Sequence, residues 1–600
     1  MQLHYKNGRL EKVLIGVNIL AAATVTATFV LLFGFHQPFW PKQEPILYAL
    51  QIVLLFIFIA EKIIRRFNAV SRTDFWGANW FEAPLLIGLV VAVLGAGRWL
   101  GHRQAEVSAV RHLAVGIYLV IQVVTKICRT SVDWAASGRN PTRTLIASFV
   151  FLIIAGAGLL MLPQAASRDK ESLGFVDALF TSTSAACVTG LTVKDTGNDF
   201  SLMGQVVILS LIQLGGLGIV IFGAVFALLL GQALSLRESA AMQDLLSTHT
   251  LSRIGNMIVF IFVGTVLIEA VGAVSLFPMW DNVPGQVTNV HQQWFCSVFH
   301  SISAFCNAGF GLFSDNLVGY SRSWGVYVVV CPLIVLGGLG FGVLYDIGGV
   351  AVDRTTRFCR TSLNRQRRFT IGTPKRMWLQ TKIVLMVTAC LIVAGMVALV
   401  FFERYARQDT TGKDFGFLDG LFQSVTARTA GFNTVDIASL TAASKFILIL
   451  LMFIGGSPGG TAGGIKTVTL AVVIMAVVAT LRKRDDVEMF GRSVRHLVVR
   501  RAITITVLFT VVLFTATLAL SVTERANGFS LLDVMFEAGS ALGTVGLSAG
   551  ITPALTTGGK LIITVMMLIG RLGPLTLLAS VTFNLRPARY SYPDEAIMVG

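Results

Sequence analysis

The sequence predicts an all-α integral membrane protein with four membrane-pore-membrane repeats around a pseudo-fourfold pore, preceded by about four extra transmembrane helices. Three observations support this fold class. The 600 residues are 54% hydrophobic and 13% charged, which is far more apolar than a soluble domain. The apolar residues fall in runs of about 18–25, the length that crosses a bilayer. A pattern of span, short glycine-containing segment and second span then recurs four times along the chain.

The N-terminal part of the chain carries spans that stand outside the recurring pattern. Apolar runs at 14–35, 46–64, 83–100 and 110–128 predict four helices. The first run is too long for the apolar core of a cleaved signal peptide and lacks an A-x-A-like site, so we expect it to remain as a span. We therefore assign residues 1–143 to a four-helix accessory membrane region.

Positive charge gathers in short connections between the spans, and the chain has a net charge of +16. The positive-inside rule places such connections in the cytoplasm, together with both termini of this chain. No recognition module for nucleic acid accompanies the charge, so we interpret it as a signal of topology in a lipid membrane. The two most basic connections contain Arg354, Arg357, Arg360, Arg365, Arg367, Arg368, Lys375, Arg376 and Lys382, and then Arg482, Lys483, Arg484, Arg492, Arg495, Arg500 and Arg501.

The four short segments align on a phenylalanine and a glycine. They read FVDALFTSTSAACVTGLTV, WFCSVFHSISAFCNAGFGL, FLDGLFQSVTARTAGFNTV and LLDVMFEAGSALGTVGLSA. The phenylalanine precedes the glycine by ten residues in three units and by nine in the third. The units divide the chain into repeats at 144–254, 255–382, 383–501 with an intramembrane gating loop, and 502–600 with the C-terminal tail.

Each short segment has helical potential over about 12–14 residues, too few to cross a bilayer, so it must enter and leave on one side. Irregular backbone survives at membrane depth where it is buried in protein or lines a wet cavity. Because glycine accepts positive φ, a strand that ends in glycine can turn its carbonyls inward. Four such strands make rings that replace the hydration shell of a cation. The predicted ion-binding filter residues are Val188, Thr189, Gly190, Asn307, Ala308, Gly309, Thr429, Ala430, Gly431, Thr544, Val545 and Gly546.

An acid lies three residues before the phenylalanine in three of the units, at Asp177, Asp419 and Asp533. The second unit has Cys296 at this position. A carboxylate in the first turn of a helix caps free backbone amides. This end of the short helix faces away from the central axis, so we interpret the acids as structural caps of the pore helices and not as ion ligands.

The motifs CVTGLTV, CNAGFG, RTAGFNT and GTVGLS resemble those of the Trk/Ktr/HKT superfamily of potassium uptake proteins. The sequences SVTARTAGFNTVD and YPDEAIMVG are similar to the Ktr-type membrane subunit. The resemblance covers about residues 144–600. It implies a homodimer in the plasma membrane that takes up potassium, with sodium as a further possible ion. It also implies a cytosolic RCK (KTN) ring that binds nucleotide and gates the pore, so that this chain itself holds no cofactor.

The third repeat contains an apolar stretch from Lys445 to Thr480, about 36 residues or roughly 54 Å if helical. Since a bilayer core measures about 30 Å, the glycines and Pro458 within the stretch predict a break. The last span contains Arg571, and a cation there is costly and is usually functional or paired. The resemblance implies that the broken segment obstructs the pore below the filter and that Arg571 is an electrostatic barrier. A packing kink and a buried ion pair are the alternatives. The candidate gating residues are Gly455, Gly456, Ser457, Pro458, Gly459, Gly460, Thr461, Gly463, Gly464, Lys466 and Arg571.

A sodium-coupled potassium symporter on the same scaffold is the alternative function. The resemblance implies that a serine at the first-repeat glycine favours sodium, and this chain has Gly190 there. We expect no enzymatic activity, because the histidines lie mostly in connections and form no convergent constellation. A buried Arg428 needs an acceptor, for which we expect Glu537 or Asp436. We interpret Glu269 as a structural partner.

Overall fold

The computed structural model is a helical protein. Within its described part, five helices are long and apolar enough to cross a membrane, and one bent pair would make a sixth. The same part contains one two-stranded sheet. The predicted all-α membrane class is thus confirmed. The structure describes residues 6–35, 43–71, 82–99, 107, 110–112, 114–123, 141–218, 254–283, 287, 289–363, 374–406 and 415–574.

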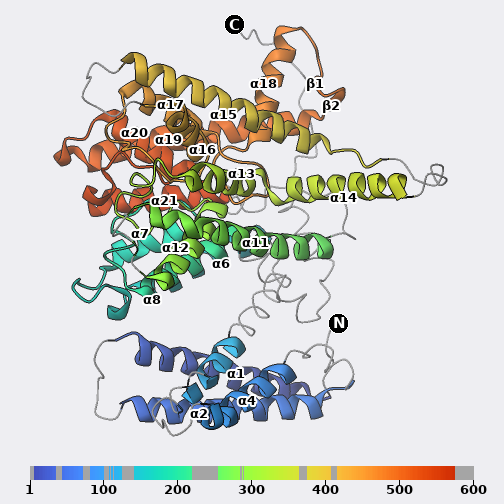
Figure 1. The fold of residues 1–600 in the computed structure, drawn as a ribbon, viewed down its shortest axis with the longest axis vertical. Coiled ribbons are helices and arrows are strands. Elements are labelled where there is room, and N and C mark those ends of the chain that lie inside the picture. The colour runs from blue at the N-terminus through green and yellow to red at the C-terminus, as the bar shows by residue number, and fades with distance from the viewer. Residues whose placement is uncertain are drawn as a thin grey trace, which may run out of the picture.

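The N-terminal helices form a bundle of their own, which Figure 1 shows in blue below the rest of the protein. It consists of α1 (Gly8–Phe33), α2 (Gln43–Asn68), α4 (Glu82–Trp99) and the apolar helix Val110–Val123. Fully buried side chains such as Phe58 join the four helices in a common core. These helices coincide with the four predicted N-terminal spans, the last of which is described as far as residue 123.

Polar contacts stabilise this bundle and attach it to the first repeat. Lys62 and Glu82 form an ion pair between α2 and α4, and Arg65 lies 2.6 Å from the Glu61 carboxylate within α2. The Gln164 side chain donates a hydrogen bond of 2.9 Å to the carbonyl of Phe35. The end of α1 is therefore fixed to the loop that follows the first span of repeat 1.

Each repeat contains a first span, a short pore helix and a second span. The pore helices α7 (Phe175–Ala186), α12 (Val290–Phe305), α16 (Phe417–Thr426) and α20 (Leu531–Gly543) have 12, 16, 10 and 13 residues. All fall short of the roughly 20 residues that a crossing helix needs. The second is longer than predicted. The third is shorter because turns follow from Ala427.

The longer elements of the repeats complete the architecture. The first spans are α6 (Pro141–Leu160), α11 (Ile254–Leu276), α15 (Leu379–Ala406) and α19 (His496–Thr523). The second spans are α8 (Leu202–Leu217), α13 (Cys331–Leu339) with α14 (Phe341–Leu363), α17 (Ala442–Phe453) with α18 (Thr467–Leu481), and α21 (Thr557–Leu572). A π-helical turn, Val326–Val330, precedes α13, and 3₁₀ turns lie at Pro163–Ala165, Phe277–Asn282, Arg525–Asn527 and Thr552–Ala554.

Two of the second spans are interrupted. Helices α13 and α14 meet at an angle of 102°, and the third-repeat stretch is broken between Phe453 and Thr467, as its glycines predicted. Gly340 at the bend has φ +86°, and Gly218 and Gly573 end α8 and α21 with φ +82° and +84°. Side chains rarely adopt this backbone conformation. These glycines are the last residues of the sequences LGGLG at 214–218 and 336–340 and IGRLG at 569–573, and each of them ends a helix.

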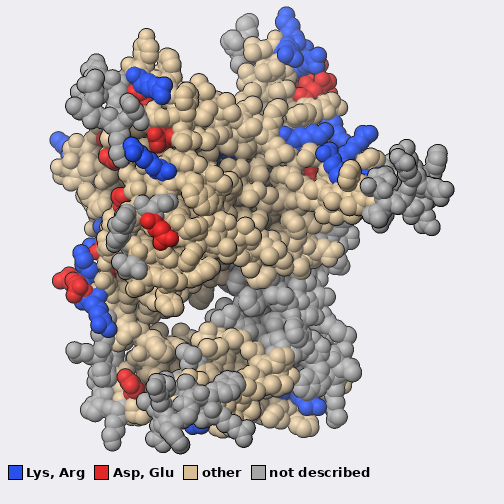
Figure 2. Space-filling model, in the orientation of Figure 1, with Lys and Arg blue, Asp and Glu red and all other residues tan. Residues whose placement is uncertain are grey.

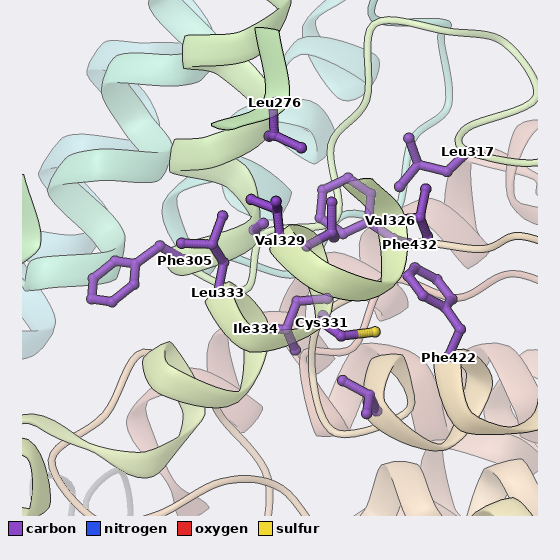
Figure 3. Close-up of a cluster of buried hydrophobic side chains, with 14 of the residues drawn as sticks. Leu276, Phe305, Leu317, Val326, Val329, Cys331, Leu333, Ile334, Phe422 and Phe432 are labelled. Carbon is purple, nitrogen blue, oxygen red and sulfur yellow. The ribbon is translucent and has the colours of Figure 1, made fainter. Parts of the chain in front are cut away.

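Four apolar cores join neighbouring repeats into a closed ring. In each core the phenylalanine of a pore helix, 0% exposed, packs with residues of the preceding repeat. Figure 3 shows the core in which Phe422 of repeat 3 meets Val326 and Cys331 of repeat 2. Close van der Waals packing stabilises contacts between helices within a membrane, so each shared core holds two repeats together. The four members are Phe180, Phe299, Phe422 and Phe536, which pack into cores with repeats 4, 1, 2 and 3 respectively.

Charged side chains gather at the edges of the molecule. Figure 2 shows a broad tan surface, with most Lys, Arg, Asp and Glu side chains at the left edge and at the upper right. The upper right includes the hairpin of β1 (Val487–Met489) and β2 (Arg492–Val494), which are antiparallel with Val487 opposite Val494. An apolar band between two charged ends is the surface that a bilayer requires.

Candidate functional site

The four predicted filter glycines meet in a closed ring. A Cβ atom placed on Gly190 would lie 2.4 Å from the carbonyl oxygen of Ala308, which belongs to repeat 2. The other three glycines approach the next repeat in the same way, at 2.8, 2.5 and 2.1 Å from the Ala430, Val545 and Thr189 oxygens. Real Cβ atoms essentially never come this close to another atom, so each position excludes every side chain. The glycines Gly190, Gly309, Gly431 and Gly546 also have φ of +94°, +69°, +77° and +94°.

The residue two positions before each glycine is left-handed as well. Val188, Asn307, Thr429 and Thr544 have φ of 56°, 59°, 71° and 51°. This conformation costs a non-glycine residue about 1–2 kcal/mol. These four side chains are at most 1% exposed, so the surrounding protein holds the strained backbone in place. Four equivalent strained positions indicate one conformation that every filter segment adopts.

The backbone amides of the segments point toward the pore helices. The amides of Thr189, Ala308 and Val545 donate to the carbonyls of Ser184, Ser303 and Ser540 at 2.7–2.8 Å. Within the described part of the chain, no hydrogen bond reaches the oxygens of the residues that precede the glycines. Carbonyl oxygens without donors at membrane depth are the ligands that a dehydrated cation needs. These four oxygens belong to Thr189, Ala308, Ala430 and Val545.

A hydroxyl supports each segment from behind, and our sequence predictions omitted it. It lies four residues after the pore-helix phenylalanine in every repeat, so the alignment of the short segments contained the signal. In repeats 1 and 4 the hydroxyl accepts from the glycine amide, and in repeats 2 and 3 it donates to the carbonyl after the glycine. The bonds are Gly190 N to Ser184 (3.1 Å), Gly546 N to Ser540 (3.0 Å), Ser303 to Phe310 O (2.8 Å) and Thr426 to Phe432 O (2.6 Å).

The ring opens on one side into a cavity of about 740 Å³, which we call the vestibule. All four filter glycines line it, together with loops of every repeat. Its charged lining residues are the acids Asp195, Asp199, Asp315 and Asp436 and the bases Lys170 and Lys194. Acids outnumber bases by four to two, and a net negative lining attracts cations.

The three predicted helix caps differ in their contacts. The Asp419 carboxylate accepts from the Gly416 amide at 3.0 Å, which is a capping contact. The carboxylates of Asp177 and Asp533 instead form ion pairs with Lys560 and Lys445, at 2.7 and 3.0 Å. Each of these lysines belongs to the preceding repeat, and the Asp533 carboxylate also accepts from the hydroxyl of its own N-cap residue, Ser530, at 2.7 Å. A capping role for Asp177 and Asp533 stays a prediction.

The broken segment of repeat 3 lies directly beneath the filter. A Cβ atom on Gly463 would lie 2.2 Å from the Thr544 hydroxyl, so the segment approaches the filter to within contact. The Gly455 amide donates to the Ile465 carbonyl at 2.9 Å and closes the segment into a loop. We call residues 455–466 the intramembrane loop. Backbone of this kind is tolerated at membrane depth because protein surrounds it.

The intramembrane loop is hydrogen-bonded to the bend of repeat 2. The Ser457 amide donates to the Gly338 carbonyl at 2.9 Å, and the Phe341 amide donates to the Gly459 carbonyl at 3.0 Å. A Cβ atom on Gly340 would lie 2.8 Å from the Pro458 oxygen. The loop and the bend therefore fit each other so closely that a movement of one changes the contacts of the other.

Arg571 connects the intramembrane loop to repeat 1. Its guanidinium donates to the carbonyl of Thr461 in the loop and to those of Gly215 and Gly216 in α8, at 2.5 and 3.3 Å. Lys466 donates to the Ala462 carbonyl at 2.6 Å. Neither cation has a carboxylate partner among the described residues, so the alternative of a buried ion pair is not observed.

The expected partners of Arg428 are wrong. Its guanidinium lies 3.5 Å from the Thr388 carbonyl of α15. Glu537 is occupied by hydroxyls of its own repeat, and Asp436 accepts from the Ala438 amide at 3.1 Å. Each acid therefore accepts hydrogen bonds from residues of a loop in its own repeat. The Arg428 guanidinium instead lies beside the first span α15.

Glu269 lies behind the second filter segment. Its carboxylate accepts from the Gln213 amide of α8 at 3.2 Å and lies 3.8 Å from the Cys306 sulfur at the end of α12. The Ser301 hydroxyl donates to the Glu269 backbone carbonyl at 2.7 Å. Glu269 thus joins repeats 1 and 2 outside the ring of carbonyls.

Comparison with known proteins places these features in a family. The family described as TrkH, cation transport protein, matches residues 112–588. The Ktr system potassium uptake protein B of Bacillus subtilis is 37% identical over 77% of this chain and 97% of its own length. The potassium/sodium uptake protein NtpJ of Enterococcus hirae is 36% identical with the same coverage. The crystal structure of the potassium transporter TrkH from Vibrio parahaemolyticus has a TM-score of 0.56 at 19% identity, covering 85% of this chain and 97% of that one.

Proposed function

The chain belongs to the TrkH family of cation transport proteins, and on this premise we propose that it is the translocating subunit of a potassium uptake system. The observation that carries the proposal is the closed ring of four glycines with four carbonyl oxygens that accept no hydrogen bond from the described residues. Such oxygens replace the water that a cation loses when it enters. Potassium is the favoured ion because two relatives at 37% identity are named for its uptake alone, whereas the relative at 36% identity is named for potassium and sodium.

Conduction proceeds from the acidic vestibule through the glycine ring. The pore helices direct their C-terminal ends, which carry partial negative charge, toward the segments that they precede. The filter residues Val188 to Gly190, Asn307 to Gly309, Thr429 to Gly431 and Thr544 to Gly546 supply the backbone ligands. The vestibule side faces the exterior, because the basic connections and both termini belong to the cytoplasm.

The intramembrane loop and Arg571 form the gate. The loop lies against Thr544 and blocks the path below the filter, while Arg571 fixes it to α8 through three carbonyls. Opening withdraws the loop and releases these hydrogen bonds. The loop also bonds to the bend before α14, which gives a cytosolic partner a mechanical route to the gate.

That partner is a cytosolic RCK (KTN) ring that binds nucleotide, and the membrane subunit is a homodimer. Support comes from two relatives that are both named Ktr system potassium uptake protein B, because a system with a protein B has more than one component. The chain needs no cofactor of its own for conduction, since backbone oxygens supply the ion ligands.

The test is ion uptake by the full-length protein in liposomes. We expect rubidium, a tracer for potassium, to enter when an outward potassium gradient drives it, and excess external potassium to inhibit uptake far more than excess sodium. Equal inhibition by the two ions would overturn the assignment of potassium. A requirement for a sodium gradient would replace the channel mechanism by sodium-coupled symport.

A further inference from the structure

The residue directly after the pore-helix phenylalanine is buried in every repeat, although its type changes. Thr181, His300, Gln423 and Glu537 occupy this position and are at most 1% exposed. In repeats 2 and 4 the side chain reaches the outer limb of its own filter segment, by which we mean residues two to six after the filter glycine.

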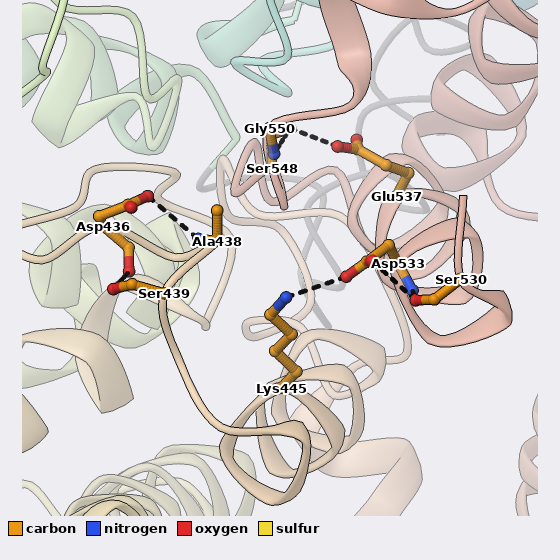
Figure 4. Close-up of polar contacts among 9 residues, drawn as sticks. All are labelled: Asp436, Ala438, Ser439, Lys445, Ser530, Asp533, Glu537, Ser548 and Gly550. Atoms are coloured by element: carbon orange, nitrogen blue, oxygen red, sulfur yellow. Dashed lines mark hydrogen bonds and ion pairs between the residues drawn. The ribbon is translucent and has the colours of Figure 1, made fainter. Parts of the chain in front are cut away.

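In repeat 4 the contact is a buried carboxylate network. Glu537 Oε1 accepts from the Ser548 hydroxyl and lies 3.1 Å from the Thr552 hydroxyl. Ser548 Oγ in turn accepts from the Gly550 amide at 2.9 Å. Figure 4 shows Glu537 on its helix pointing at Ser548 and Gly550 across the turn. A buried carboxylate is stable only while it is hydrogen-bonded, so acid and limb hold each other in place.

In repeat 2 the contact is a buried imidazole. His300 Nδ1 lies 2.8 Å from the Cys296 carbonyl, and Nε2 lies 3.4 Å from the Leu312 amide. A neutral ring that donates from Nδ1 and accepts at Nε2 satisfies both contacts. The ring packs against Trp280 and Phe313, with centroids 4.8 and 5.4 Å away, and these two rings also contact each other at 5.5 Å. These aromatic neighbours fix the imidazole against the limb.

Repeats 1 and 3 lack such a contact within the described residues. The Thr181 hydroxyl donates to the Asp177 carbonyl of its own helix at 2.8 Å. Neither the amide nitrogen nor the amide oxygen of Gln423 has a hydrogen-bond partner in the described ranges. Because the repeats follow one another around the ring, the two supported segments lie opposite each other.

We propose that Glu537 and His300 are positioning residues that determine the ion selectivity of the filter by fixing the outer limbs of two opposite segments. The proposal rests on the proposed function and adds specificity-determining residues outside the ring of carbonyls. Selection between potassium and sodium depends on the spacing and flexibility of the carbonyl ligands. When the outer limb loses its contact with Glu537 or His300, the filter glycine and the carbonyl before it can move. The pore helix and the apolar core shared with the preceding repeat keep their structure.

The experiment measures the selectivity of rubidium uptake by full-length variants in liposomes. Ser548→Ala and Thr552→Val remove the donors to Glu537 without touching the ring, and His300→Leu removes the imidazole acceptor. We expect each of Ser548→Ala and His300→Leu to lower the potassium-over-sodium inhibition ratio about tenfold, which corresponds to 1.4 kcal/mol. This is within the range of a single intramolecular hydrogen bond. Rubidium uptake itself should persist.

Two further variants separate positioning from folding. His300→Gln keeps an amide acceptor in the same direction and should restore part of the ratio. Thr181→Val is the matched control, because it changes the same position in a repeat where the hydroxyl bonds to its own helix. An unchanged ratio in folded Ser548→Ala and His300→Leu would overturn the proposal, as would an equal loss in Thr181→Val. A wild-type protein without selective uptake would instead overturn the proposed function.

Discussion

The ion pair between Asp177 and Lys560 closes the ring of repeats, and its removal gives a quantitative prediction. The two residues are 383 positions apart in the chain, and their charged atoms lie 2.7 Å apart. The pair joins the pore helix of repeat 1 to the second span of repeat 4. We consider the variants Asp177→Asn and Lys560→Met, separately and together.

The expected coupling follows from burial. Two unit charges about 4 Å apart attract by roughly 4 kcal/mol at an effective dielectric constant near 20. Desolvation and side-chain ordering offset much of this attraction, and fully exposed pairs contribute about 0.2–1 kcal/mol. The Asp177 and Lys560 side chains are 25% and 16% exposed, so we expect about 1–2 kcal/mol of coupling. Each single variant should cost more, because it leaves a partly buried charge without its partner.

The assay is the free energy of unfolding of the four proteins in mixed micelles, combined in a double-mutant cycle. The chain supplies two comparisons. Lys445 and Asp533 are 12% and 24% exposed and should show similar coupling, whereas Arg484 and Glu488 are 57% and 55% exposed and should show less than about 0.5 kcal/mol. The reasoning is refuted if the Asp177–Lys560 coupling does not exceed that of the exposed pair.

Three further predictions concern rubidium uptake in liposomes. Gly546→Ala should abolish uptake, because the new Cβ atom would overlap the Thr189 carbonyl and an alanine at φ +94° adds about 1–2 kcal/mol of strain. The control is Gly16→Ala, whose Cβ atom would meet nothing within 4 Å, and it should leave uptake intact. Arg571→Ala removes a charge and three carbonyl contacts, so uptake should rise in a folded protein, and an unchanged rate would contradict a gating role. Ser540→Ala should cost about 1 kcal/mol and reduce selectivity, whereas Ser210→Ala, whose hydroxyl bonds to its own helix, should do neither.

The fold was predictable because its signals are local or repeated. Apolar runs determine spans, and a short helix followed by glycine determines a re-entrant segment. The break between Phe453 and Thr467 was predictable for the same reason, since glycine and proline disfavour a continuous helix wherever it lies. The 102° bend at Gly340 was not predicted, because an LGGLG motif is equally compatible with close helix packing.

The site was predictable in its backbone and much less so in its side-chain partners. The filter glycines were identified from their alignment, and the structure brings all four into one ring. The acceptor for Arg428 is the backbone carbonyl of Thr388. It could not be predicted from the sequence, because every residue has a backbone carbonyl and the residue type gives no signal. Glu537 was assigned to the wrong partner since hydroxyls eleven and fifteen residues away satisfy it within its own repeat.

The acids at the start of the pore helices show how one sequence position takes different roles around the ring. The fourth residue after the N-cap contacts the next repeat in the second spans of repeats 2, 3 and 4. It is Lys445 in repeat 3 and Lys560 in repeat 4, and there the acid of the next pore helix forms an ion pair. The equivalent residue of repeat 2 is Tyr327, which packs edge-on against Phe422, and the acid of repeat 3 therefore remains free to cap its own helix.

Repeat 1 has no lysine at this position of its second span, and the next pore helix has no acid. The equivalent residue is Gln205, whose amide donates to carbonyls of the loop before its own helix, at 3.2–3.3 Å. The next pore helix has Cys296 in place of an acid. A carboxylate there would lie partly buried without a lysine, at a cost of several kcal/mol. An acid thus occurs at the start of a pore helix where a lysine of the preceding repeat or a free backbone amide can bind its carboxylate. These partners can be identified only when the order of the repeats around the ring is known.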